Sequence, residues 1–599
     1  MSHNIPEYQL VSTKNDVIRA IKQCASRKTA TALDFETTAF TPQEGKVRLA
    51  SLCNDQDHYL IDFGVEGLEP YAQYFDVGQW VVFNAGFELR WFLHFGHTPT
   101  LLDVGYLRRA ILGGGGFSLK LMVKWDLDIE MSKEQQASNW GATDLSQEQL
   151  DYAYLDADLT WRLWVHWIGQ ADPDHWRGFA LLNGMVPAVV EMETAGMRLD
   201  QKAHKALVKD WTQIQLQKIE DLRALVPQEE VDNINSDAQW SDYFARNMPD
   251  NFLKGWPRTE KTGQLSMKTV TLNKLAGMVP GTPLEKFFDS LAGYKTISKY
   301  ISSFGTTLIT SSQNSPDKRI RARFNIGQAK TCRFSSSGPN LQQIPRDKDL
   351  LGKATSVRRS FIAGLGKALV SLDYSGIELR VLALLSNDDQ LLQDMVEGDV
   401  HSEVATVIAG HKIDKKTKEG KAARTAAKGV SFGIIYGSGA EGLAATMRTT
   451  VTKAEEYIAF WEDRYRNAFN YRFKMLDEAE RTRYIRCVDG GTIYMGRRPE
   501  IPKLANYPVQ RAALSIMARA IIRHKESLDV HRSNGLQKRT KMLATIHDAL
   551  IDESGIKDAK DCLTIMEQDM ITGYLDIFPG ASTDRLVEGG IGPNWAELD

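Results

Sequence analysis

Short apolar runs bounded by glycine or polar turns predict the elements that carry candidate chemistry. Residues 368–372 form such a run between Gly366 and the Ser375-Gly376 pair, which is typical of a buried strand. Residues 377–385 then place apolar side chains at helical spacing, so a strand, a turn and a helix are predicted in this order. Asp373 ends the strand, where a rigid backbone could hold a metal ion, although capping of the following helix would also explain a carboxylate here.

An alternating pattern near the N-terminus predicts a second strand with paired carboxylates. Side chains in residues 31–38 alternate between two faces, so Asp34 and Glu36 share one of them. Two carboxylates on one face repel each other unless a cation lies between them, but a solvated edge strand has the same pattern. Further along, Tyr152 and Asp156 are four residues apart on a predicted helix and also share a face.

Helical patterns dominate from about residue 179, and one of them carries an unusual stripe. Long polar helices are predicted over 201–225 and 284–304, with a polar loop at 258–266 between them. The stripe consists of four residues spaced by four along a later helix and is about 18 Å long. Its members are Arg424, Lys428, Phe432 and Tyr436. Amphipathic helices usually bury aromatic residues, but two leading cations are costly to bury unpaired, so an anionic ligand is the better explanation.

Composition limits the classes of protein that fit these patterns. The 599 residues should form several domains, and 43% hydrophobic with 25% charged residues is ordinary for a soluble globular protein. The net charge of -3 gives no sign of nucleic-acid binding, so a polyanion would have to meet local basic patches. Five scattered cysteines without a CxxC pair argue against a zinc site or disulfides. With no apolar run of membrane-spanning length and no signal peptide, a cytoplasmic protein without membrane contact is predicted.

Two segments resemble the palm motifs of the family A DNA polymerases, the group of bacterial DNA polymerase I. The segment DYSGIELR at 373–380 resembles the first motif, and His547-Asp548 after the strand at 542–546 resembles the third. The resemblance implies that Asp373, the Tyr374 backbone and Asp548 hold two Mg²⁺ ions, with Mn²⁺ as an alternative. The bacterial pattern has Gln at position 376 and Glu at position 549, so the grip on the primer terminus or the minor groove is expected to differ.

The striped helix lies in RTAAKGVSFGIIYG at 424–437, which resembles the nucleotide-binding helix of the same family. By this resemblance Arg424, Lys428 and His401 would bind the triphosphate, with Lys428 also a candidate proton donor to pyrophosphate. Glu378 and Phe432 would crowd the sugar 2′ position and exclude ribonucleotides. Tyr436 would complete the nucleotide site beside the base.

The segments TCRFSS at 331–336 and PNLQQIP at 339–345 resemble the family's primer–template-binding segment. The match implies that Arg333 contacts the minor groove at the primer end. Acceptors there are shared by all correct pairs, so such a contact tests pair geometry without reading sequence. The other implied primer–template residues are Asn340, Gln510, His547 and Arg497.

Three N-terminal segments resemble the motifs of 3′–5′ proofreading exonucleases that use four acidic residues and a tyrosine. They are residues 31–38, 84–88 and 152–158. The implied roles are metal binding by the carboxylates and orientation of the attacking water by Tyr152. The implied ligands are Asp34, Glu36, Glu88 and Asp156. Glu88 stands where the family usually has Asp, and a solvated helix residue is the alternative explanation for it.

The resemblance predicts an α/β and α+β multidomain protein, with an RNase H-like exonuclease domain followed by a right-hand polymerase. The predicted domains are 1–175 (exonuclease), 176–329 (thumb and connecting helices), 330–400 (first part of the palm), 401–500 (fingers) and 501–599 (second part of the palm). No 5′ nuclease domain is expected before the exonuclease, and by analogy this suggests a phage or plasmid replication enzyme.

The predicted function is DNA-templated DNA synthesis with associated proofreading. The predicted partners are primer–template DNA and deoxynucleoside triphosphates, with replisome proteins such as a helicase–primase and a single-strand binding protein, and the chain is expected to be a monomer. Three alternatives remain: a single-subunit RNA polymerase-like enzyme, a mainly degradative 3′–5′ exonuclease, and an inactive DNA-binding scaffold. Glu378 and the exonuclease motifs speak against the first, and the presence of Asp373, Asp548 and Lys428 speaks against the last.

Overall fold

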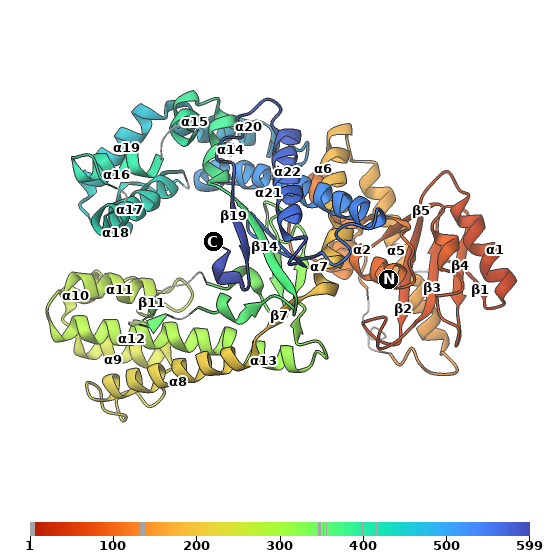
Figure 1. Cartoon of the computed structure of the whole chain (residues 1–599), viewed down its shortest axis with the longest axis horizontal. Helices are drawn as coiled ribbons and strands as arrows, with labels where there is room; N and C mark the ends of the chain where they lie inside the picture. Colours follow the sequence, from red (N-terminus) through yellow and green to blue (C-terminus); the bar gives the residue numbers. More distant parts are fainter. Residues whose placement is uncertain are drawn as a thin grey trace.

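The computed structural model describes most of the chain. The described residues are 6–131, 138–345, 349–350, 353–354, 356–396, 400–414, 417–435, 437–447 and 449–598. A sheet with its helices lies at one end of the molecule, two groups of helices lie at the other, and a second sheet lies between them (Figure 1). Among the described residues, no helix is long and apolar enough to cross a lipid bilayer.

The N-terminal sheet has six strands in the order β1-β4-β3-β2-β5-β6. The strands are β1 (Gln9–Val11), β2 (Thr31–Thr37), β3 (Val47–Cys53), β4 (His58–Asp62), β5 (Gln79–Val82) and β6 (Thr100–Asp103). The helices here are α1 (Lys14–Ala25), α2 (Ala85–His94), α3 (Val104–Leu112), α4 (Leu119–Leu127) and α5 (Gln147–Ile168). Strand β2 pairs with β3 antiparallel and with β5 parallel, so it lies inside a mixed sheet. The alternative of a solvated edge strand for residues 31–38 is therefore wrong.

Helices follow, as the polar helical pattern predicts. They are α6 (Pro173–Gly184), α7 (Val186–Ala195), α8 (Gln201–Arg223), α9 (Asp237–Asn247), α10 (Asp250–Lys254), α11 (Thr269–Met278), α12 (Pro283–Tyr300) and α13 (Thr306–Gln313). The predicted helix over 201–225 is confirmed by α8. A hydrophobic core separate from the main one holds α9 to α12 and the end of α8 together, and it includes Trp240, Phe244 and Phe288. Their own core lets them pack as a unit beside the rest of the molecule.

The second sheet is antiparallel, with the order β17-β18-β14-β19. Its strands are β14 (Lys367–Tyr374), β17 (Lys541–Ile546), β18 (Ala549–Gly555) and β19 (Val587–Gly592). Helices α14 (Ile377–Ser386), α21 (Ile501–Ser533) and α22 (Ala559–Ile577) flank it. Strand β14 is the predicted buried strand, and the N-cap residue of α14 is Gly376, three residues after Asp373.

A further group of helices lies between α14 and α21 in the chain and lies above the long helices α8 and α12 in Figure 1. It comprises α15 (Asp389–Val396), α16 (Val400–Ala409), α17 (Lys418–Ile435), α18 (Ala440–Met447), α19 (Val451–Arg464) and α20 (Arg466–Thr482). Short strands complete the fold: β7 (Met197–Leu199), β8 (Arg319–Ile320), β9 (Arg323–Asn325), β10 (Ser335–Ser337), β11 (Asp349–Leu350), β12 (Lys353–Ala354), β13 (Phe361–Ile362), β15 (Tyr484–Arg486) and β16 (Thr492–Tyr494).

Candidate functional site

The central sheet brings the two palm aspartates together. Asp373, near the end of β14, pairs across the ladder with Ala549 of β18, and Asp548 lies in the tight turn that precedes β18. The Tyr374 backbone N–H donates to the Asp548 carbonyl oxygen at 3.2 Å. The buried Tyr374 side chain donates its hydroxyl to the Met570 carbonyl oxygen of α22 at 2.6 Å. Because β14 is paired on both sides, these carboxylates stand on a rigid backbone.

Gln342 holds the turn that carries Asp548. Its side-chain oxygen accepts the His547 backbone N–H at 2.8 Å, and its amide donates to the Thr545 carbonyl oxygen at 2.7 Å. His547 has a positive φ of 57°, a conformation that side chains adopt at a cost unless neighbouring contacts hold it. Gln342 belongs to the segment PNLQQIP, two residues after Asn340, but the sequence pattern predicts no role for its side chain.

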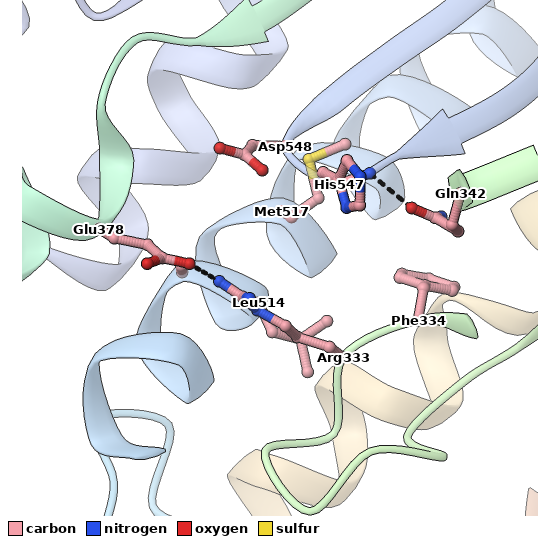
Figure 2. A pocket seen from close by; sticks show the side chains of 9 residues that line it. Arg333, Phe334, Gln342, Glu378, Leu514, Met517, His547 and Asp548 are labelled. Atoms are coloured by element: carbon pink, nitrogen blue, oxygen red, sulfur yellow. Dashed lines mark hydrogen bonds and ion pairs between the residues drawn. The ribbon is translucent and has the colours of Figure 1, made fainter. Parts of the chain in front are cut away.

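A cavity of about 220 Å³ lies beside this turn. It is lined by Arg333, Phe334, Gln342, Glu378, Ala513, Leu514, Met517, His547 and Asp548. Figure 2 shows Arg333 and Glu378 meeting across it, and their guanidinium and carboxylate form an ion pair. The structure therefore brings two predicted residues together, although one was assigned to the primer end and the other to the nucleotide sugar.

The predicted primer–template residues Gln510, Asn340 and Arg497 do not line this cavity. Gln510 of α21 accepts a hydrogen bond from the Thr331 hydroxyl at 3.2 Å, two residues before Arg333. Asn340 accepts from the Ser336 hydroxyl at 3.0 Å. Arg497 is exposed and lies outside the cavity lining. Gln510 and Asn340 thus support the loop that carries Arg333.

The striped helix is α17, and its cationic residues face solvent. Arg424 and Lys428 are exposed, Phe432 is half-buried, and Ala427 and Val430 are buried on the opposite face. The Lys428 ammonium lies 5.8 Å from the centre of the Phe432 ring. The centre of the His401 ring, on α16, lies 6.0 Å from the centre of the same Phe432 ring. Tyr436 lies outside the described residues. Glu378, the other predicted nucleotide-site residue, lines the cavity beside Asp548, and none of the described stripe residues does.

The N-terminal sheet assembles a compact acidic cluster. Asp34 and Glu36 of β2 and Asp156 of α5 each offer one carboxylate oxygen, and these oxygens lie within 4.8 Å of one another. Burial and the neighbouring carboxylates raise the pKa of Glu36 to about 10, and they hold the pKa of Asp34 well above its usual range. Such crowding is unfavourable unless a cation shares the site, and carboxylate oxygens are the ligands that Mg²⁺ and Mn²⁺ prefer.

Glu88 borders this cluster but is not part of it. Its side chain is 2% exposed in the first turn of α2, so the alternative of a solvated helix residue is wrong. Burial and the nearby Asp34 raise the pKa of Glu88, and its Oε2 atom is buried without a hydrogen-bond partner. An unpartnered carboxylate oxygen beside Asp34 fits a further metal ligand.

Two more residues shape the acidic site. Burial, together with Asp156, Glu36 and Asp34, raises the pKa of Tyr152, so its hydroxyl stays protonated. Asp103, a residue not predicted from the sequence, caps α3 and accepts the backbone N–H groups of Asn84 and Ala85, each at 2.9 Å. These bonds fix the start of α2 and thereby the position of Glu88. In the sequence, an aspartate between a predicted strand and a predicted helix indicates such a helix cap.

Comparisons with known proteins define the class. The family model for DNA polymerase family A matches residues 203–597, and the family model for 3′–5′ exonuclease matches residues 8–166. The molecule is thus a two-part protein of mixed α/β architecture, with an exonuclease domain before a polymerase domain. The chain belongs to DNA polymerase family A.

Individual relatives agree with this assignment. DNA polymerase I of Aquifex aeolicus is 24% identical over 99% of this chain and 100% of its own length. Those of Chloroflexus aurantiacus and Rhizobium leguminosarum are each 29% identical, over 76% and 69% of this chain. The chain spans about half the length of these two relatives, 47% and 40%. A solved structure, the POL domain of Pol1 from M. smegmatis in complex with DNA primer-template and dNTP, matches 98% of this chain and 100% of that chain with a TM-score of 0.79 and 20% identity, which supports the fold.

Proposed function

We propose that this protein is a DNA-templated DNA polymerase with a two-metal mechanism and an associated 3′–5′ proofreading exonuclease. The observation that carries the proposal is the junction of β14 with the turn before β18: Asp373 pairs with Ala549, the residue after Asp548, and Asp548 lines a cavity together with Arg333 and Glu378. The same chain carries a separate acidic cluster on another sheet. Family membership makes divalent metal ions the expected cofactors of both sites.

In the polymerase site, Asp373, the Tyr374 carbonyl and Asp548 are the proposed ligands of two Mg²⁺ ions, with Mn²⁺ as a substitute. Bound there, the ions would make the primer 3′-hydroxyl easier to deprotonate and would neutralise charge on the triphosphate. The chain's own task is to hold these carboxylates still. The paired strand β14 and the Gln342 bridge do this before any substrate arrives.

Helix α17, its following residue Tyr436 and His401 of α16 would supply the groups that meet the nucleotide. Arg424, Lys428 and His401 would bind the phosphates, and the Lys428 ammonium would give a proton to the departing pyrophosphate. Phe432 would lie beside the sugar and Tyr436 beside the base. None of the described ones lines the cavity at Asp548, so the proposed nucleotide site extends beyond that cavity.

The pair formed by Arg333 and Glu378 has to open, or be shared, before both residues can perform their proposed roles. Arg333 would turn to the minor groove of the primer end, supported by Asn340, Gln510, His547 and Arg497. Glu378 would then be released toward the sugar 2′ position, where it excludes a hydroxyl. Substrate binding would thus exchange one ion pair for two contacts.

In the exonuclease site, Asp34, Glu36, Glu88 and Asp156 are the proposed metal ligands. Tyr152 would orient the attacking water with a hydroxyl that stays protonated. The water would attack the terminal phosphodiester of a single strand and release a nucleotide. The carboxylates already lie together, so this site needs no large rearrangement.

Primer extension on a defined template tests the proposal. With Mg²⁺ and the complementary deoxynucleotide, the protein should add one residue to the primer, and ribonucleotides should be used far less well. Equal use of ribonucleotides would point to an RNA polymerase-like enzyme. Degradation that continues at full rate when all nucleotides are present would point to a mainly degradative exonuclease.

Domain limits and biological setting extend the same proposal. The proposed parts are an exonuclease domain (1–175), a thumb with connecting helices (176–329), a palm in two parts (330–400 and 501–599) and fingers (401–500). We place the enzyme in phage or plasmid DNA replication as a monomer that works with a helicase–primase and a single-strand binding protein. Light scattering with and without primer–template tests the monomer, and co-purification from infected or plasmid-bearing cells tests the partners.

A further inference from the structure

Four consecutive glycines of the exonuclease domain, residues 113–116, make backbone contacts with the polymerase domain. They follow α3, and their backbone meets the backbone of residues 327–330. The Gly114 N–H donates to the Lys330 carbonyl oxygen at 2.9 Å, and the Gly115 N–H donates to the Gly327 carbonyl oxygen at 3.1 Å. A Cβ atom on Gly114 would lie 1.8 Å from the Ala329 carbonyl oxygen, so only glycine allows this approach.

Side chains reinforce the contact from both domains. The Lys330 ammonium donates to the Leu112 carbonyl oxygen at the end of α3, at 3.1 Å. The Thr492 hydroxyl, from the hairpin strand β16, donates to the Ile111 carbonyl oxygen. The last turn of α3 therefore has carbonyl groups bonded to the polymerase domain rather than to solvent.

Helix α3 begins at the exonuclease site. Asp103 caps it and also accepts the N–H groups that open α2, the helix that carries Glu88. Nine residues at 1.5 Å each make α3 about 14 Å long. One short helix thus connects the acidic cluster to the glycine contact.

The segment contacted by the glycines leads directly to Arg333. Thr331 donates its hydroxyl to Gln510 at 3.2 Å, and the buried Cys332 thiol is contacted by the guanidinium of Arg511. Arg511 is itself held by Asp489, with Nε 2.6 Å from the carboxylate. Arg333 therefore extends from a segment that α21 holds on one side and the exonuclease domain holds on the other.

We propose that the loop of residues 113–116 is a positioning element for the primer end: it acts through Arg333, so that the exonuclease domain sets how the polymerase domain grips the primer terminus. Gly114 is its positioning residue. Loss of the close contact would leave residues 327–330 free to shift and would displace the Arg333 guanidinium from the base pair it tests. This inference rests on the proposed polymerase function.

The test compares Gly114→Ala with Gly115→Ala. A Cβ on Gly115 would meet Phe117 at 3.8 Å, which is ordinary contact, so this variant controls for a substitution in the same loop. Single-turnover primer extension should fall about tenfold in Gly114→Ala and stay within twofold of the parent in Gly115→Ala. Degradation of single-stranded DNA should stay within twofold in both, because the acidic cluster is not touched.

A double-mutant cycle separates positioning from general damage. In an Arg333→Ala background, Gly114→Ala should have less than a twofold further effect on extension, because the arginine side chain through which Gly114 acts has been removed. A full tenfold further loss would overturn the inference, as would normal extension by Gly114→Ala itself. If circular dichroism shows that Gly114→Ala does not fold, the same cycle is run with Lys330→Met, which removes the hydrogen bond to the Leu112 carbonyl oxygen. A parent protein without template-directed extension would instead refute the proposed function.

Discussion

The proposed exonuclease site and the proposed polymerase site differ in how much of each is assembled without substrate. In the first, carboxylate oxygens of Asp34 and Glu36 on β2 and of Asp156 on α5 lie within 4.8 Å of one another. In the second, Asp548 lies in the turn before β18 and Lys428 lies on helix α17, and the ion pair of Arg333 and Glu378 spans the cavity beside Asp548. A site that cleaves one strand can be preformed, whereas a site that must test a template, a primer and a nucleotide is completed by those substrates.

The largest expected effect comes from a substitution that inactivates the proposed polymerase site and leaves the proposed exonuclease site intact. Asp548→Ala should reduce primer extension by at least 1000-fold, because loss of a metal ligand removes about 4 kcal/mol or more of transition-state stabilisation. Degradation of single-stranded DNA should remain near the parent rate. Rapid-quench extension assays measure the first and a labelled single strand measures the second. Extension at a tenth of the parent rate would contradict the assignment of Asp548.

The reciprocal substitutions should inactivate the proposed exonuclease site. Asp34→Ala combined with Glu36→Ala should lower degradation at least 100-fold and leave extension unchanged, because the two sites share no ligand. Glu88→Asp should keep or raise degradation, and Glu88→Ala should lower it. A Glu88→Ala protein that degrades single strands as fast as the parent would show that the buried carboxylate is not a ligand.

A third prediction contrasts the crowded carboxylates with a buried ion network in the polymerase domain. The two ring nitrogens of His524 lie 2.8 Å from Asp569 and Asp552. Burial alone would lower the pKa of His524, but these carboxylates outweigh it and raise the pKa to about 9. The folded-state pKa exceeds the ordinary value, so the network stabilises the fold fully below about pH 6.5. That contribution, about 3 kcal/mol, is lost as the pH rises through 9.

Denaturant unfolding of the parent and of His524→Gln between pH 6 and 10 measures this effect. The difference in unfolding free energy between the two proteins should shrink with rising pH. A difference that is constant across the range would mean that His524 is not charged in the folded protein.

The smallest expected effect sharpens the description of α17. Phe432→Tyr adds one hydroxyl to a half-buried ring that is proposed to lie beside the sugar. This hydroxyl can replace the interaction that a dideoxynucleotide lacks, a gain of about 1.4 kcal/mol or a tenfold rise in dideoxynucleotide use. Competition between dideoxy- and deoxynucleotides in single-turnover extension measures it. An unchanged ratio would mean that Phe432 does not face the sugar.

Local pattern was sufficient for the elements and for the residues close together in the chain. The apolar run before Asp373 predicted β14, and the spacing of Arg424, Lys428 and Phe432 predicted the helix that is now α17. Alternation in β2 placed Asp34 and Glu36 on one face. These predictions succeed because strand and helix periods depend on backbone geometry alone. The exact domain limits and the roles of single site residues stay predictions.

Contacts between distant segments were decided by the tertiary structure. The sequence pattern could not show that Arg333 pairs with Glu378, that Gln342 holds the turn at His547, or that the glycines at 113–116 meet residues 327–330. Each joins segments 45 to 216 residues apart, where no periodicity links one position to the other. Only the packing of sheets and helices sets which backbones approach, so the sequence by itself determined the parts of both sites, and the fold decided how those parts meet.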